Sequence, residues 1–107
     1  MQIRPIIPRE EAERDVDDVL SYYLDENAPE AAHGFIDALE SAYQHISQFP
    51  GTGSPRYANE LNLPEIRHWS LGNILYLIFY VEQHGHIGVW RILHSQRDIP
   101  EFWLNNL

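Results

Sequence analysis

The stretch Ile74-Leu75-Tyr76-Leu77-Ile78-Phe79-Tyr80-Val81 is an almost uninterrupted run of aliphatic and aromatic residues. Runs of this length and composition are typical of a strand that is covered on both faces of a sheet. Gly72-Asn73 before the run and Gly85 after it are reverse-turn signals. The sequence therefore predicts a central strand over 74–81 that is entered and left through short turns.

The segments on either side of this run are also predicted to be strands. Ile66 to Leu71 precedes the first turn, and Ile87 to His94 follows the second. Successive strands joined by short turns are antiparallel. Strict alternation over 87–94 divides that strand into two faces, with Ile87, Val89, Arg91 and Leu93 on one face and Gly88, Trp90, Ile92 and His94 on the other.

The first half of the chain has the three-and-four spacing of amphipathic helices. One helix is predicted from Arg9 to about Glu26, and Asn27-Ala28-Pro29 interrupts the pattern and restarts it. A second, longer helix follows and is stopped by Pro50-Gly51. Acidic residues are expected in the first turns and on the outer face of the first helix, at Glu10, Glu11, Glu13, Asp15, Asp17 and Asp18.

The remaining segments complete one domain over residues 1–107. Gln2 to Ile7 is compatible with a strand, Gly51 to Asn59 reads as a loop, and Ile99 to Leu107 reads as a short helix begun by Pro100. The expected order is β-α-α-β-β-β-α. This is an α+β fold in which a helical hairpin packs on a small antiparallel sheet.

Composition narrows the possible functions. The chain has no cysteine, which excludes disulfides, thiolate zinc sites and cysteine nucleophiles. Its net charge is -9, and all seven basic residues are arginines. A strongly acidic chain repels phosphate backbones, so we expect no direct nucleic-acid binding. No apolar run is long enough for a membrane span and no signal peptide is evident, so we expect no membrane contact and a cytoplasmic location.

Five strings along the chain match one known family in order and spacing. The most informative is the segment Arg91-Ile92-Leu93-His94-Ser95-Gln96-Arg97-Asp98. The others are Ala12…Asp15…Val19…Tyr22-Tyr23, Phe49-Pro50-Gly51, Ile66-Arg67 and Tyr76-Leu77-Ile78-Phe79-Tyr80. With these strings the chain resembles the RelE/ParE superfamily of bacterial toxins, and most closely its ParE branch, over roughly residues 9–98.

This resemblance implies a toxin of a type II toxin–antitoxin system, neutralised by a labile cognate antitoxin that is ParD-like or similar. ParE-like members inhibit DNA gyrase and trap it on cut DNA, whereas RelE-like members cleave messenger RNA in the ribosomal A site. Antitoxins of this kind resemble disordered tails that fold onto the toxin. The acidity of this chain predicts either a more basic tail or an interface dominated by apolar burial.

The ribonuclease alternative needs groups that move protons and stabilise a charged phosphorane. Its candidate residues are Arg67, Arg91, His94 and Arg97, with Glu65 as a possible base. RelE-like enzymes are rich in lysine and arginine on the sheet face, and this chain has no lysine. The structural alternative is that Arg67 and Arg91 pair with carboxylates, that Asp98 pairs with Arg97, and that His94 makes a hydrogen bond at a strand end.

A gyrase inhibitor needs a shaped binding surface instead, and we expect no catalytic residue in it. Arginine and tryptophan are common anchors of protein interfaces. The residues expected to contact target or antitoxin are Arg67, Trp90, Arg91, His94, Arg97, Asp98 and Trp103. Core packing is at least as good an explanation for each tryptophan. A third reading is a binding module that no longer inhibits anything.

Two other kinds of chemistry have little support. His84-Gly85-His86 puts two imidazoles in one turn, without an evident third ligand, so we expect no metal and no cofactor. Ser95 follows His94 only in sequence and lacks the glycine-rich elbow of a serine nucleophile.

Overall fold

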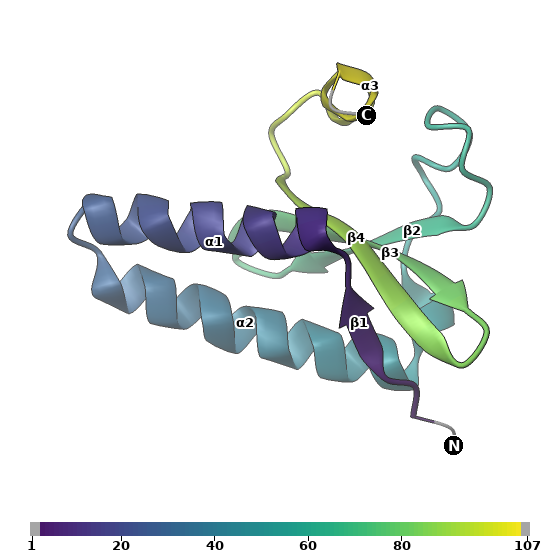
Figure 1. Cartoon of the computed structure of the whole chain (residues 1–107), viewed down its shortest axis with the longest axis horizontal. Helices are drawn as coiled ribbons and strands as arrows, with labels where there is room; N and C mark the ends of the chain where they lie inside the picture. Colours follow the sequence, from purple (N-terminus) through teal and green to yellow (C-terminus); the bar gives the residue numbers. More distant parts are fainter. Residues whose placement is uncertain (1–2, 106–107) are drawn as a thin grey trace.

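The computed structural model describes residues 3–105, which form two helices, a four-stranded sheet and a short C-terminal helix (Figure 1). The strands are β1 (Ile6–Pro8), β2 (Ile66–Leu71), β3 (Ile74–Gln83) and β4 (His86–His94). The helices are α1 (Glu10–Asp25), α2 (Pro29–Gln48) and α3 (Ile99–Asn105), with a 3-10 turn, η1, at Pro50–Thr52. The predicted order of elements and the α+β class are confirmed. Gln2 and the last two residues of the predicted C-terminal helix lie outside the described part.

The helices begin and end where the sequence signals predicted. Ala28 is the N-cap of α2, and Pro29 occupies its first turn, where a missing N–H costs nothing. Asn27 adopts a left-handed conformation with a φ of 53° between the two helices. That conformation closes the connection tightly, and α1 and α2 run as an antiparallel hairpin (Figure 1).

The sheet has the order β1-β4-β3-β2. The three consecutive strands β2, β3 and β4 are antiparallel, as predicted. β1, however, lies parallel to β4, with Ile6 opposite Ile87, so the sheet is mixed rather than wholly antiparallel. The prediction missed this because a strand separated from its partner by a helical hairpin and two further strands receives no direction from its own sequence.

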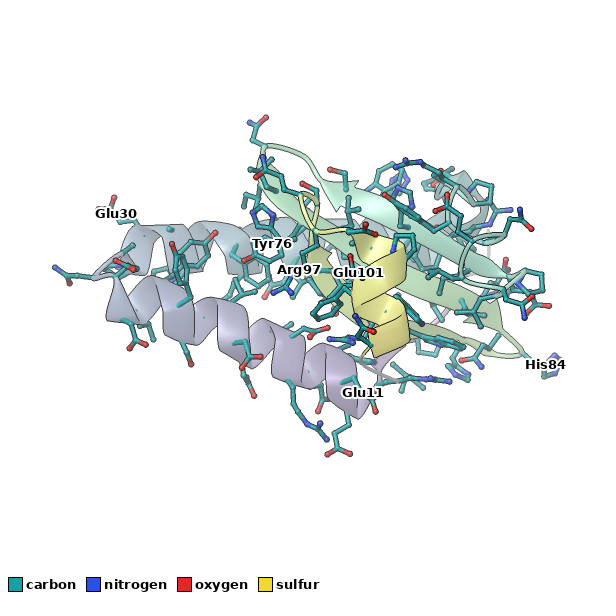
Figure 2. All side chains as sticks on the ribbon, turned by 90° about the horizontal axis from the view of Figure 1, so that it is seen from above. Glu11, Glu30, Tyr76, His84, Arg97 and Glu101 are labelled. Atoms are coloured by element: carbon teal, nitrogen blue, oxygen red, sulfur yellow. The ribbon has the colours of Figure 1, made fainter. Side chains whose placement is uncertain are left out.

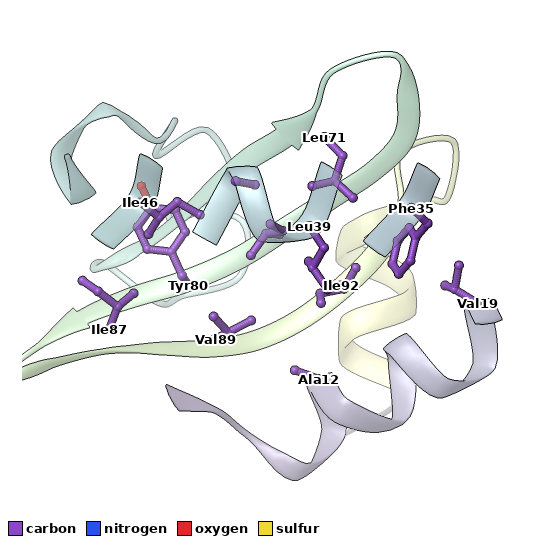
Figure 3. Packing of buried hydrophobic residues seen from close by; sticks show 12 residues of the cluster. Ala12, Val19, Phe35, Leu39, Ile46, Leu71, Tyr80, Ile87, Val89 and Ile92 are labelled. Carbon is purple, nitrogen blue, oxygen red and sulfur yellow. The ribbon is translucent and has the colours of Figure 1, made fainter. Parts of the chain in front are cut away.

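The central strand β3 is buried on both faces, as its composition predicted. All five residues from Leu77 to Val81 are buried. Ile78 and Tyr80 join the core beneath the hairpin, whereas Leu77, Phe79 and Val81 join a second core on the opposite face. The hairpin-side core contains mainly aliphatic residues from both helices and from β4, including Ala12, Val19, Phe35, Leu39, Ile46, Val89 and Ile92 (Figure 3).

The face of the sheet opposite the hairpin is covered by irregular chain and by α3. Tyr57, Leu61 and Leu63 come from the connection between η1 and β2, and Ile99 and Trp103 come from α3. In Figure 1, α3 lies above the sheet at the end of an extended linker, on the side away from α2. The two faces are therefore covered by very different kinds of structure.

A bulge in β4 overturns the predicted alternation of that strand. Val89 is opposite Tyr80 and Arg91 is opposite Phe79, so Trp90 is an extra residue in the ladder. Past the bulge the side chains exchange faces. Ile87, Val89 and Ile92 consequently share the hairpin-side core, while Leu93 joins the opposite core.

Tyr80 fixes the end of the hairpin to the sheet. Its hydroxyl donates a hydrogen bond of 2.6 Å to the carbonyl of Pro50 and accepts one of 3.0 Å from the N–H of Gly53. A Cβ atom at position 53 would lie 2.1 Å from this hydroxyl oxygen. Only glycine therefore allows the chain to pass this close to the tyrosine.

A candidate binding groove between helices 1 and 3

A hollow of about 480 Å³ opens between α1, the end of β4 and α3. A neighbouring hollow of about 740 Å³ extends it towards the start of β3. Both are lined by Tyr22, Tyr76, His94 and Arg97, so they form one continuous depression, here called the α1–α3 groove. Viewed from the α3 side, Tyr76 and Arg97 lie next to α3, between it and the helical hairpin (Figure 2). The groove is also lined by Asp15, Asp18, Val19, Leu75, Arg91 and Phe102.

Asp15 and Arg91 form a nearly buried ion pair at one end of the groove. Nε and Nη2 of Arg91 each donate a hydrogen bond of 2.8 Å to a different carboxylate oxygen of Asp15. The N–H of Ile92 donates a third, of 2.9 Å, to the same carboxylate. The side chains of Arg91 and Asp15 are only 17% and 11% exposed. Hydrogen bonding to Asp15 raises the pKa of Arg91 against the opposing effect of burial.

This pair confirms one prediction and corrects another. Arg91 was expected to pair with a carboxylate, and it does. Asp15, in contrast, was expected on the solvated face of its helix, whereas it points inward and ties α1 to β4. Because both carboxylate oxygens engage Arg91, its guanidinium is held in place and its charge is balanced inside the protein.

His94 closes β4 and shapes the turn that follows. Its Nδ1 accepts a hydrogen bond of 3.2 Å from the N–H of Gln96, and its carbonyl accepts one of 3.2 Å from the N–H of Arg97. The predicted hydrogen bond of His94 at a strand end is thereby confirmed. The imidazole meets the ring of Tyr76 edge to face at 5.1 Å. Burial, followed by the nearby Tyr23, raises the pKa of Tyr76, and Arg97 lowers it.

Arg97 presents its charge at the mouth of the groove. The residue is exposed, and its guanidinium carbon lies 4.3 Å from the centre of the Phe102 ring. The predicted ion pair with Asp98 is wrong, because Oδ1 of Asp98 accepts a hydrogen bond from the N–H of Glu101 in the first turn of α3. Across residues 3–105 the guanidinium of Arg97 makes no ion pair with a carboxylate.

Arg67 lies away from this groove. Its Nη1 donates a hydrogen bond of 2.7 Å to the carbonyl of Gly53, so its predicted carboxylate partner is replaced by a backbone oxygen. It lines a separate hollow on β2 together with Glu65 and Glu82. The sheet order puts β2 and β4 on opposite sides of β3. Arg67 and Glu65 are therefore not brought together with Arg91, His94 and Arg97.

The tryptophans occupy three different environments. Trp103 is 6% exposed and packs edge to face on Phe79, within the core under α3. Trp90, at the bulge, is covered on one face by the guanidinium of Arg9 at 3.7 Å. Trp69, on the edge strand β2, stacks on His45 with ring centres 4.1 Å apart. The tryptophans therefore do not form one surface, and Trp103 packs as a core residue.

Comparison with known proteins identifies the family. The family model described as the ParE toxin of the parDE type II toxin–antitoxin system matches residues 6–99. The chain belongs to the ParE toxin family. A solved structure titled "Chromosomal ParDE TA system from P. aeruginosa" has the same fold, with a TM-score of 0.72 and 18% identity over 88% of this chain and 98% of that one. No curated protein matches the sequence significantly.

In this ParE-family chain, the sequence predicted the part of the groove that comes from β4 and the turn after it, and it missed the part that comes from α1 and β3. Arg91, His94 and Arg97 were selected, and the groove contains all three. Asp18, Tyr22 and Tyr76 were not selected as site residues, although Tyr22 and Tyr76 stood in the strings that carried the resemblance. The sequence held one signal that Asp15 points inward. Asp15 is a carboxylate three residues after Ala12 and four before Val19, so it lies on the apolar stripe of its helix.

Two further observations complete the description. Within residues 3–105, no three or more histidine, cysteine, aspartate or glutamate side chains are arranged to hold a metal ion. None of the described helices is both long and apolar enough to cross a membrane.

Proposed function

We propose that this chain inhibits DNA gyrase by binding it as a protein partner, and that a cognate antitoxin neutralises it. The observation that carries the proposal is the match to the ParE toxin model over residues 6–99, nearly the whole chain. ParE-like toxins act on gyrase. Since gyrase works in the bacterial cytoplasm, the proposal also assigns the chain to that compartment.

The geometry of the groove favours binding over RNA cleavage. A ribonuclease of the RelE type would need its cations and its acid or base around one phosphate. Here Arg91 is held by Asp15, and Arg67 lies at the other side of β3. Of the candidate catalytic residues, His94 and Arg97 alone remain together and without a carboxylate partner among the described residues. The net charge of -9 also makes the chain repel RNA. The ribonuclease alternative is therefore not favoured.

Arg97 is the residue best placed to contact the target. It is exposed, its guanidinium lies over the ring of Phe102, and it lines the same groove as the half-exposed Tyr22. Arginine and tyrosine are the residue types that most often dominate binding energies at protein interfaces. His94 supports this surface by holding the turn that carries Arg97.

The test is a supercoiling assay with purified gyrase, relaxed plasmid and ATP. The parent chain should block supercoiling and accumulate linear, protein-linked DNA. Arg97→Glu should need at least about tenfold more protein for the same effect, which is the loss expected at an interface hot spot. Arg14→Glu is the matched control, because Arg14 is an exposed arginine paired only with Glu10 on α1, and its inhibition should equal that of the parent.

Three results would contradict the proposal. Full gyrase activity at a large excess of folded chain would exclude the target. Cleavage of messenger RNA on purified ribosomes would support the RelE-type alternative. Inhibition of neither machine, combined with tight antitoxin binding, would indicate a binding module that has lost its toxicity.

A further inference from the structure

Three exposed arginines have no carboxylate partner. Arg9, Arg14, Arg56 and Arg97 are all exposed, and Arg14 pairs with Glu10. Across residues 3–105 the other three form no ion pair. Their positive charges are therefore available to a partner.

The guanidinium groups of these three arginines lie over aromatic rings. That of Arg9 lies 3.7 Å from the centre of the Trp90 ring, and that of Arg56 lies 4.6 Å from the centre of the Tyr57 ring. Arg97 is placed in the same way, as described above. A guanidinium that stacks on a ring is held flat, and the N–H groups of its edge can still bind a carboxylate.

The three stacks share one face of the molecule. Their rings belong to residues in or against the core under α3, namely Tyr57, Trp90 and Phe102. Arg9 directly precedes α1, Arg56 lies in the connection between η1 and β2, and Arg97 lies in the turn before α3. Figure 2 is viewed onto this side, with α3 in front of the sheet. The surface formed by Arg9, Arg56 and Arg97 is here called the arginine face.

Neither member of the Arg9–Trp90 stack is well placed for stability. Arg9 is the N-cap of α1 and makes no capping hydrogen bond with its side chain. A cation at this position is opposed by the positive end of the helix dipole. Nε1 of Trp90 is buried without a hydrogen-bond partner in the described part, which is also unfavourable. A role in binding accounts for this stack better than a role in folding.

The chemistry around these arginines favours a protein partner over DNA. Glu10 directly follows Arg9, Asp98 directly follows Arg97, and both carboxylate residues are exposed. A DNA backbone carries closely spaced phosphates, so it would meet these carboxylates and the net charge of -9 as well. A protein surface can place single carboxylates against single guanidinium groups.

We infer that gyrase covers the arginine face, with one carboxylate of the enzyme against Arg9 and another against Arg56, in addition to the contact at Arg97. The inference rests on the proposed function, since it takes gyrase as the target. It adds two contact residues that do not line the α1–α3 groove, and it defines the chemistry of the surface that they meet.

The experiment measures the Kd of the full chain for purified gyrase by biolayer interferometry, together with inhibition of supercoiling. The test variants are Arg9→Asp and Arg56→Glu. The matched control is Arg14→Glu, which changes the net charge by the same amount at an exposed arginine of α1. Each test variant should raise the Kd at least about tenfold, as hot-spot substitutions do, and the control should stay within about twofold.

Urea denaturation separates an effect on binding from an effect on folding. Aspartate is a favoured N-cap residue, so Arg9→Asp should keep the stability of the parent. Weaker binding at unchanged stability supports the inference. A loss of binding that only follows a loss of folded chain would assign Arg9 to the fold and overturn the inference.

Two further results would also overturn it. An unchanged Kd in either test variant would mean that the gyrase surface does not extend to that arginine. Binding of the parent chain to a short DNA duplex, weakened by the same substitutions, would assign the arginines to DNA.

The failure of this inference is distinguishable from the failure of the proposed function. If the parent inhibits gyrase and Arg97→Glu weakens it while Arg9→Asp and Arg56→Glu do not, gyrase inhibition stands and the arginine face falls. If the folded parent does not bind gyrase at all, both fall together.

Discussion

The two faces of the sheet are covered in contrasting ways. On one face, the 16-residue α1 and the 20-residue α2 bury a continuous, mainly aliphatic core. On the other, an irregular connection and the seven-residue α3 cover a core rich in aromatic rings. The two long helices cover one face of the sheet continuously. The irregular connection and α3 cover the other face in separate segments, and a groove remains where the two covers meet.

This groove is the α1–α3 groove. One wall is α1, which belongs to the regular cover, and the other is the turn and α3, which belong to the irregular one. Arg91 crosses the boundary, because it shares its ladder position with Phe79 of the second core yet binds Asp15 on α1. The helical hairpin covers one continuous core, and the candidate binding groove lies where this regular cover meets the irregular one.

The largest effect is expected from breaking the contact that ties the hairpin to β4. Asp15→Asn removes the only carboxylate that pairs with the nearly buried guanidinium of Arg91 within the described part. Losing one partner of a buried ion pair is strongly destabilising, so the free energy of unfolding should fall by about 3 kcal/mol. Urea denaturation followed by circular dichroism measures it. The control Arg14→Ala breaks an exposed pair and should change stability by less than about 0.5 kcal/mol. A loss below about 1 kcal/mol in Asp15→Asn would show that the pair does not anchor the hairpin.

A smaller loss is expected at the end of the hairpin. Gly53→Ala would force its new Cβ to within 2.1 Å of the Tyr80 hydroxyl unless the chain moves. Overpacking of this kind typically costs 1–3 kcal/mol, so we expect about 2 kcal/mol in the same urea experiment. Gly51→Ala is the matched control, since nothing lies within 4 Å of its added Cβ. Equal stability of the two variants would mean that the loop relaxes freely and that Tyr80 does not fix it.

The smallest change in stability is expected from His68, which packs against the aromatic core on the α3 face, and this change depends on pH. Burial, followed by the nearby charge of Arg56, lowers the pKa of His68. The unfolded chain therefore binds a proton at this histidine more readily than the folded chain, and stability should fall as the pH drops below about 6.5. Thermal unfolding between pH 7.5 and 5 should show a shallower decline for His68→Gln than for the parent. His33→Gln, at an exposed position on α2, should keep the slope of the parent, and identical slopes for all three would exclude a role for His68.

The sequence predicted those parts of the fold whose causes are local. Pro29 and Pro50-Gly51 set the limits of α2, and Gly72 supplies the positive φ of the β2–β3 turn. The direction of β1 was not predicted, because it depends on a partner strand about 80 residues away. The bulge at Trp90 was also missed, since one extra residue changes the pairing without changing the composition.

In the candidate site too, residues close together in the sequence were predicted and contacts between distant residues were not. Arg91, His94 and Arg97 were selected from the one segment, 91–98, that carries most of the resemblance, and the structure puts them in one groove. Arg67 was taken from a different matching string, Ile66-Arg67, and it lies elsewhere. Asp15 engages Arg91 across 76 positions, so only the packing of α1 against β4 reveals that contact.

The most direct test of the proposed gyrase inhibition is pulse labelling in a bacterial host just after this chain alone is induced. Thymidine and leucine incorporation are followed side by side over the first minutes. If the chain inhibits gyrase, thymidine incorporation should fall first while leucine incorporation persists. A collapse of leucine incorporation before any change in thymidine incorporation would contradict it.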